Sequence, residues 1–461
     1  MRSKTSRVDE FVGNPRRALW VLALPIMIGM SIQTIYMLVD MMFVGRVSAR
    51  ALAALAFNMP VVFLGIGVIF GLGSGVTAVI ARYIGAEDKR GADSAAEHGV
   101  VLGLVLSSVF TGCAYIWGRQ LLGILGVPDD LLPLAWDYFS VLAGGYIFLV
   151  MSVFFRSILS GEGDMKTPML IQGSGTLLNI ALDPLFIFTF QMGVRGAAWA
   201  TVLSQMVAAA AFVYLLFFKE HAYVSFDRRN FRFDPGVLGR IFEIGLPASF
   251  SFLVIALGGA VFNRILVSYS QDAVAAFQVG ARIDHIFLLP VIGISASLVT
   301  LVGMFTGARR QDLVRAILFY AMLRSILIAG IVGSLFFALA PQILGLFTSS
   351  APIAEMGVSY LRINVLAYPF IAVIVLAGRA MQGMGKGAPA LVLALLRVVL
   401  ISAPLATVFA FVVHKPVHWI WWSIFIGMAV TAVIASVWLR VVLRNRLVDS
   451  EGLIPDPAAV G

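Results

Sequence analysis

The sequence predicts an all-α integral membrane protein whose twelve transmembrane helices form two pseudo-symmetric six-helix bundles. Three observations lead to this fold class. Hydrophobic residues make up 60% of the 461 residues and charged residues only 12%, a composition that excludes a soluble globular protein. Apolar stretches long enough to cross a bilayer recur along the whole chain. The two halves of the chain also match each other at one constant offset.

The apolar stretches give the limits of the expected helices. A bilayer core is crossed by about 20 apolar residues in a helix. The first stretch is too long for a signal-peptide core, and no small-residue cleavage site follows it, so we expect a retained helix. The twelve expected spans are 17–44, 51–81, 93–118, 132–158, 168–190, 194–218, 236–268, 275–306, 314–340, 357–382, 388–413 and 417–443.

Basic residues indicate the orientation of these helices. With a cytoplasmic N-terminus, most Lys and Arg residues fall in the inner loops, which is the usual bias of membrane proteins. We therefore expect both termini inside, in a multi-pass protein of the plasma (inner) membrane of a prokaryote. The net charge of +9 follows from this topology and does not indicate nucleic-acid binding. The few basic residues of the outer loops are Arg46, Arg50, Arg119, Arg195, Arg264 and Lys415.

The internal repeat has an offset of 222 residues, which relates Pro25 to Pro247 and Tyr138 to Tyr360. Because six spans separate the copies, both halves start on the same side of the membrane, and the repeat is parallel. The expected organisation is a cytoplasmic N-terminal segment 1–16, an N-terminal bundle 17–218, a cytoplasmic linker 219–235, a C-terminal bundle 236–443 and a cytoplasmic tail 444–461.

Two aspartates lie inside otherwise apolar spans: Asp40 in the first and Asp183 in the fifth. A carboxylate costs several kcal/mol in lipid and is kept where it faces a cavity, a partner or an ion. Asn179 precedes Asp183 by four residues and shares its helix face. Pro184 cannot donate to the carbonyl of Ile180, so a backbone oxygen is left free beside the acid.

The neighbouring polar residues extend this candidate site. Tyr36 and Gln33 share the helix face of Asp40, and Thr201 in the sixth span is a further candidate ligand. The oxygen atoms of Asp40, Asp183 and Asn179 suit a sodium ion. Desolvation and a second nearby carboxylate also disfavour ionisation, so the site equally suits proton exchange. Pro25 can kink the first span, and together with Pro184 it is the candidate for conformational change.

Several motifs carry a family resemblance: V-D-x-x-F-V-G at 39–45, A-L-A-A at 51–54, G-A-E-D-K-R at 85–90, R-x-x-L-x-G-E-G-D at 156–164 and N-x-x-x-D-P at 179–184. With the parallel repeat, they resemble the multidrug and toxic compound extrusion (MATE) family, DinF-like branch, over residues 15–445. The resemblance implies a monomeric exporter of small organic, often cationic, compounds among membrane lipids. It also implies no cofactor, only a coupling ion, H⁺ or Na⁺, that enters as the substrate leaves.

The C-terminal half departs from the better-known sodium-coupled branch of this family. That branch carries acids in helices 7 and 10, whereas segments 250–262 and 364–378 hold none here. The remaining C-terminal candidate is Asp284 in the eighth span, with Arg282 and His285 beside it. We expect its carboxylate to form an internal pair with the arginine.

Other classes remain to be compared with this interpretation. A flippase for lipid-linked substrates of the same superfamily shares the repeat, but few cations lie inside helices here, among them Arg324 and Arg397. A major-facilitator transporter also has parallel six-helix repeats, yet its loop motif after helix 2 is spaced differently. The chain lacks the H-E-x-x-H and G-x-S-x-G motifs of an intramembrane enzyme. Its single cysteine, Cys113, excludes an intramolecular disulfide.

Overall fold

A computed structural model describes residues 7–219, 221–226 and 231–451. The ends of the predicted terminal segments, 1–6 and 452–461, lie outside the described residues. Within the described part the secondary structure is helical throughout, without strands. Eleven of the described helices are long and apolar enough to cross a membrane, and a bent pair brings the number to twelve. The predicted all-α membrane fold with twelve spans is confirmed.

The chain divides into two compact units. Unit 1 contains Leu24–Ile84 and Asp88–Gly245, and unit 2 contains Val8–Ala23, Gly85–Glu87 and the described residues from Leu246 onward. Each unit therefore corresponds to one copy of the repeat, apart from the first segment of each copy and the short loop Gly85–Glu87.

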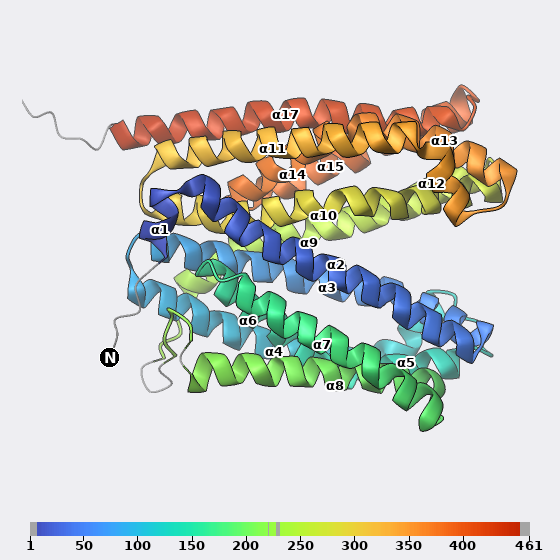
Figure 1. Cartoon of the computed structure of the whole chain (residues 1–461), viewed down its shortest axis with the longest axis horizontal. Coiled ribbons are helices and arrows are strands. Elements are labelled where there is room, and N and C mark those ends of the chain that lie inside the picture. Colours follow the sequence, from blue (N-terminus) through green and yellow to red (C-terminus); the bar gives the residue numbers. More distant parts are fainter. Residues whose placement is uncertain (1–6, 220, 227–230, 452–461) are drawn as a thin grey trace, which may run out of the picture. The chain divides into compact units, whose positions relative to one another are not determined.

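Unit 1 is a bundle in which α4 packs on α5 and α6, and α8 packs on α5, α6 and α7. Figure 1 shows α7 and α8 running side by side in green. The helices of this unit are α2 (Pro15–Val47, from Leu24), α3 (Ala49–Gly85), α4 (Lys89–Ile124), α5 (Leu132–Gly144), α6 (Tyr146–Gly161), α7 (Lys166–Pro184), the π-helix η1 (Leu185–Thr189), α8 (Gly193–Val213), the π-helix η2 (Tyr214–Phe218) and the first turns of α9 (Pro235–Val267).

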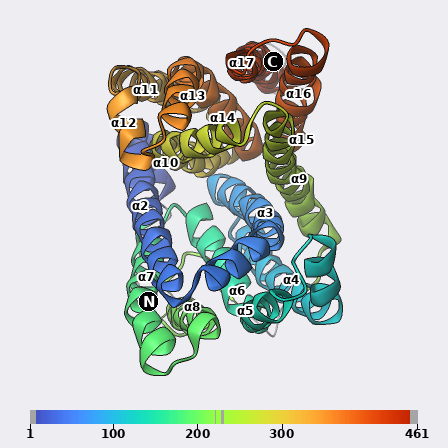
Figure 2. The same ribbon diagram turned by 90° about the vertical axis from the view of Figure 1, so that its right-hand side faces the viewer.

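Unit 2 is built around α10 and α14, which pack on each other. α10 also packs on α11 and α13, and α14 also packs on α11. Figure 2 shows α10, α13 and α14 next to one another. Its helices are α1 (Val8–Gly13), the rest of α9, α10 (Gln271–Gly307), α11 (Gln311–Ala338), α12 (Ala340–Phe347), α13 (Ala351–Asn364), the 3₁₀ turn η3 (Val365–Ala367), α14 (Tyr368–Gly383), α15 (Ala388–Leu395), the π-helix η4 (Leu396–Ser402), α16 (Ala403–Thr407), the π-helix η5 (Val408–Val412) and α17 (His418–Glu451).

The fourth predicted span is not one straight helix. α5 and α6 meet at Gly145 and are bent there by 48°. Consecutive glycines, Gly144 and Gly145, tolerate such a break. A side chain at Gly145 would also meet Val202 of α8, so this glycine lets α8 approach the bend closely.

Two long helices pass from one unit to the other. α2 changes from unit 2 to unit 1 between Ala23 and Leu24, immediately before Pro25, and α9 changes in the opposite sense immediately before Leu246 and Pro247. Pro25 and Pro247 are related by the repeat, so both copies place a helix-weakening residue at the same point.

The first turns of α2 belong to unit 2 through a specific contact. The indole nitrogen of Trp20 donates to the Tyr320 hydroxyl at 3.0 Å, and the Arg16 guanidinium lies over the Tyr320 ring. Tyr320 is part of α11, so the start of α2 is fixed to that helix.

Carboxylates of unit 1 hold the linker after η2. The Glu162 carboxylate accepts the backbone N–H groups of Tyr223 and Val224 at 2.9 and 2.7 Å, and Asp93 accepts that of Ser225 at 2.7 Å. Further along, His98 accepts the backbone N–H of Asp234 at 2.8 Å. The linker is therefore anchored to unit 1 through its own backbone.

Glu162 gives the protein a pH-dependent stability. Burial raises its pKa to about 7, against the opposing effect of the two N–H donors. As pH rises from its ordinary value of 4.5 to about 7, the unfolded chain loses this proton before the folded protein does. The free energy of unfolding therefore falls as pH rises through that window. Below and above the window, this group gives no further change with pH. We expect Glu162→Gln to remove this decline in melting temperature, measured in detergent at stepped pH.

The matched control for Glu162 is Glu355→Gln, because Glu355 is exposed on α13. It should retain the decline of the wild type. A Glu162→Gln protein with the same pH slope as the wild type would show that this carboxyl group is not the origin of the dependence.

Candidate functional site

The site is built around two polar side chains of α7. Asn179 is 3% exposed and Asp183 is fully buried. Both amide atoms of Asn179 and both carboxylate oxygens of Asp183 lack a hydrogen-bond partner among the described residues. Buried polar groups are nearly always paired, and an unpaired carboxylate is especially costly. Two adjacent exceptions on one helix face therefore mark a position that is shaped for something other than packing.

The helix changes its winding immediately after Asp183. α7 ends at Pro184 and continues as the π-helix η1 (Leu185–Thr189). Proline lacks the N–H group that would close the α-helical turn, and single π-helical turns are frequent at functional sites. The helix type therefore changes at Pro184, directly after Asp183.

The residues predicted on α2 face the same position. Tyr36 interacts electrostatically with Asp40, Asp183 and Thr201, and Asp183 interacts with Asp40. Tyr138 of α5 also interacts electrostatically with both aspartates. Helices α2, α5, α7 and α8 therefore bring the two acids and the tyrosines together within unit 1.

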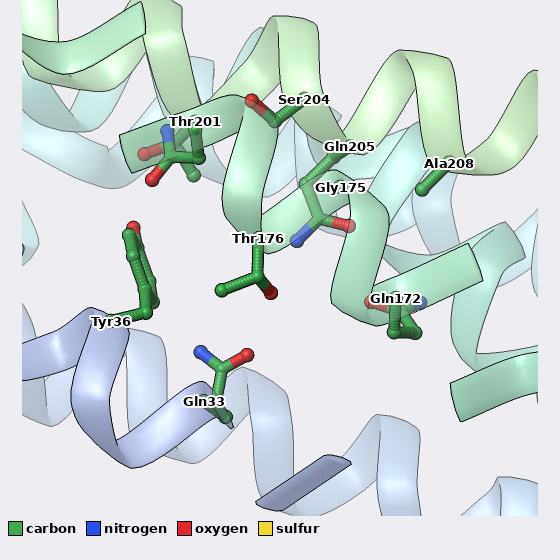
Figure 3. A pocket seen from close by; sticks show the side chains of 10 residues that line it. Gln33, Tyr36, Gln172, Gly175, Thr176, Thr201, Ser204, Gln205 and Ala208 are labelled. Carbon is green, nitrogen blue, oxygen red and sulfur yellow. The ribbon is translucent and has the colours of Figure 1, made fainter. Parts of the chain in front are cut away.

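A small polar cavity is lined by Asn179 and Tyr36, while Asp40 and Asp183 themselves do not line it. Figure 3 shows Tyr36 and Gln33 of α2 facing the polar side chains of α7 and α8. The cavity encloses about 30 Å³, and roughly 10–15 Å³ is the least that one water molecule needs. It has room for one or two waters or a small cation, but not for a drug-sized molecule. Its lining residues are Gln33, Tyr36, Gln172, Gly175, Thr176, Asn179, Thr201, Ser204, Gln205 and Ala208.

Four polar residues of this lining were missed by the sequence interpretation. Thr176 and Gln172 precede Asn179 by three and seven residues, and Ser204 and Gln205 follow Thr201 by three and four. These spacings place side chains on one helix face. Extending the period from Asn179 and from Thr201 would have found all four.

The donor atoms of the site suit a small hard cation or a proton. Two carboxylates, an amide and several hydroxyl groups are oxygen donors, the class that binds such cations. The described residues contain no group of three or more His, Cys, Asp or Glu side chains that could hold a metal ion. The proposed sodium ligands Asp40, Asp183 and Asn179 would thus have to be completed by neutral oxygens such as those of Tyr36 and Thr201.

The prediction for Asp284 in unit 2 was wrong about its partner. Its carboxylate accepts hydrogen bonds from Tyr360, Asn364 and Tyr368, and the ion pairs of the described residues do not include it. Residues two apart on a helix do not face each other, and Arg282 is exposed, so the expected pair with Arg282 does not form.

Gly196 sets the packing of α8 against the segment that follows Asp183. A Cβ atom there would lie 2.7 Å from the carbonyl carbon and oxygen of Phe186 in η1. Because backbone atoms cannot move aside cheaply, we expect Gly196→Ala to destabilise the protein by about 1–3 kcal/mol. A lower melting temperature of the purified protein would show this. Gly112→Ala in α4 is the control, because a Cβ atom there meets nothing within 4 Å; equal melting temperatures of the two variants would contradict the packing argument.

Comparison with known proteins identifies the family. The MatE family profile matches residues 25–185 and again residues 247–408. The two matches begin 222 residues apart, which is the offset of the internal repeat. The chain belongs to the MatE family.

Relatives of this MatE protein span nearly its full length. A probable multidrug resistance protein of Bacillus subtilis, YpnP, is 28% identical over 401 residues, covering 86% of this chain and 89% of the relative. An FAD transporter of Shewanella oneidensis is 27% identical over 409 residues, covering 86% and 88%. Both are named as resistance or transport proteins, in agreement with the expectation that the MatE chain is not an enzyme.

The fold of the MatE chain also matches solved structures. A MOP superfamily transporter from Pyrococcus furiosus superimposes with a TM-score of 0.92 at 32% sequence identity, covering 96% of this chain and 99% of that one. The multidrug efflux family and its fold are thereby established.

Proposed function

We propose that this MatE protein is a secondary active antiporter that exports organic, often cationic, compounds as protons or sodium ions enter. The observation that supports this most directly is the buried pair Asn179 and Asp183, unpartnered within the described residues and next to Asp40. Two carboxylates kept in an apolar bundle repel each other when ionised, so they attract a proton or a small cation.

The size of the cavity separates the coupling ion from the substrate. The cavity of about 30 Å³ that Asn179 lines admits a small ion or water but not the exported compound, so we assign the coupling ion, and not the substrate, to this part of the bundle. An ionised carboxylate is costly to bury among apolar side chains. Neutralising Asp40 and Asp183 therefore lowers the free-energy cost of packing the helices of unit 1 closely around them. In the proposed cycle, ion binding to Asp40 and Asp183 lets the N-terminal half repack and release the substrate to the outside.

Prolines give the repacking a defined location. Pro25 stands where α2 changes units, and Pro184 begins the π-helical turn beside Asp183. A helix bends most readily at such positions. We propose that bending at these two points links the occupancy of the acids to the shape of unit 1.

The substrate class is tested by transport with purified protein. Proteoliposomes would be loaded with a fluorescent organic cation such as ethidium, and a pH gradient and a sodium gradient would be imposed separately. We expect dye movement under one gradient, which then identifies the coupling ion. Movement under neither, in protein that retains its melting transition, would contradict the proposal and favour lipid-linked or anionic substrates, the latter in keeping with the FAD-transporting relative.

A further inference from the structure

The carboxylate of Asp284 is held by three neutral donors of one neighbouring span. Tyr360 and Asn364 donate to one of its oxygens at 2.6 and 2.5 Å, and Tyr368 donates to the other at 2.7 Å. The three donors are spaced by four residues along α13 and the start of α14, so they lie on one helix face. They are buried, at 3%, 5% and 0% exposed.

Aromatic rings fix the two tyrosines in place. The Tyr368 ring stacks on Phe287 of α10 with centroids 3.9 Å apart, and the Tyr360 ring meets Trp421 edge to face at 5.0 Å. Gly280 lies one helical turn before Asp284, and any side chain there would collide with the Tyr360 ring. The arrangement is therefore built by α10, α13, α14 and α17 together.

Basic side chains of α10 and of the helices packed on it are exposed or have other contacts. Arg282 and His285 of the same helix are exposed. On the packed helices, Arg362 lies over the Phe337 ring, Arg379 donates to Gln382, and Arg324 lies over the Tyr320 ring. An ionised Asp284 thus has no permanent counter-charge among the described side chains.

The chemistry of the three donors distinguishes a proton from a metal ion. At distances of 2.5–2.7 Å the donors contact the carboxylate directly, leaving no room between them for an ion and its ligands. Three of the roughly four lone-pair positions of a carboxylate are used, and one remains. A tyrosine hydroxyl both donates and accepts, so Tyr360 and Tyr368 can satisfy the acid with or without a proton.

The repeat supplies an independent observation. Tyr360 is the counterpart of Tyr138 at the offset of 222, and Tyr138 lies within electrostatic range of Asp40 and Asp183 in unit 1. Each copy therefore places the same tyrosine within electrostatic range of an intramembrane aspartate, although the aspartates themselves occupy different helices.

We propose that Asp284, cradled by Tyr360, Asn364 and Tyr368, is a proton-binding site of the C-terminal unit. Asp284 as a residue is half-buried. Protonation changes which groups donate between α10 and the α13–α14 span, so the packing of unit 2 depends on it. This site is independent of the exchange proposed for unit 1.

The test is infrared difference spectroscopy of the purified protein as pH is stepped. Measurement in the Asp40→Asn/Asp183→Asn background removes the two intramembrane acids of the unit 1 site, so the result does not depend on transport, and the remaining carboxyl groups such as Glu162 are the same with and without Asp284→Asn. We expect a protonated-carboxyl band that appears at low pH and is lost on adding Asp284→Asn. Tyr368→Phe, which keeps the acid and the ring, should shift its frequency and serves if Asp284→Asn fails to fold.

The control and the contradicting results follow from the same spectra. Asp137→Asn removes an exposed aspartate of α5. It should leave unchanged the protonated-carboxyl band that Asp284→Asn removes. A background protein without any titrating band that responds to Asp284→Asn or Tyr368→Phe would overturn the proposal. A band that disappears when sodium chloride replaces choline chloride at constant pH would show that sodium competes with the proton and would overturn the argument that the donors leave no room for a metal ion.

Discussion

Replacing Asp183 with asparagine is expected to abolish gradient-driven export while leaving the protein folded. Asparagine has nearly the shape of a protonated aspartate but cannot release a proton or carry charge. The side chain is fully buried and its carboxylate oxygens lack partners in the described structure, so no hydrogen bond or ion pair is lost. In proteoliposomes, dye accumulation by Asp183→Asn should fall to that of protein-free vesicles.

Three further measurements make the Asp183 result specific. The melting transition of Asp183→Asn should persist, because the substitution breaks no hydrogen bond or ion pair of the described structure. Asp137→Asn, on the exposed face of α5, should transport like the wild type. Asp40→Asn should behave like Asp183→Asn, since the two carboxylates interact. Full gradient-driven accumulation by either variant would remove that acid from the coupling site.

Steady-state accumulation should reveal the number of protons if the coupling ion is H⁺. One pH unit supplies about 1.4 kcal/mol per proton, and 100 mV supplies about 2.3 kcal/mol per net charge moved. One proton exchanged for one monovalent cation moves no net charge and sustains only about a tenfold gradient. Two protons, one on each of Asp40 and Asp183, move one net charge and sustain about 5 kcal/mol, a gradient of several thousand-fold.

The measurement that separates these stoichiometries is the response to membrane potential. Exchange of two protons for one monovalent cation should be accelerated by a membrane potential, whose required sign depends on how the protein is oriented in the vesicle. Abolishing the potential should lower the steady-state dye gradient. Accumulation that is insensitive to potential, with a proton-to-dye ratio near one, would leave only one of the two acids to carry a proton.

The architecture could be predicted because it depends on properties that are local in the sequence. Apolar length determines each span, and the repeat at 222 residues appears again in the two family matches that begin at 25 and 247. The bend at Gly145 and the π-helices, such as η1 and η4, could not be predicted. They depend on which neighbouring helix approaches and on which backbone groups find partners, and no hydrophobic period encodes either.

The candidate site shows the same division. Asp40, Asp183 and Asn179 stand out because acids and amides are rare inside apolar spans. Their position relative to Tyr138 could not be predicted, because α2, α5 and α7 are far apart in the sequence and only the folded bundle brings them together. Asp284 illustrates the error most clearly: sequence proximity suggested Arg282 as its partner, but tertiary packing supplied Tyr360, Asn364 and Tyr368 from a distant span.

The exchange of α2 and α9 between units means that neither half of the gene encodes a self-sufficient piece. A fragment ending in the linker would carry Val8–Ala23 without the α11 surface that Trp20 and Arg16 contact. The complementary fragment would begin with turns of α9 that belong to unit 1. Separately produced halves should therefore be unstable alone and should recover a native complex only when made together, each completing the other's bundle with its first helix.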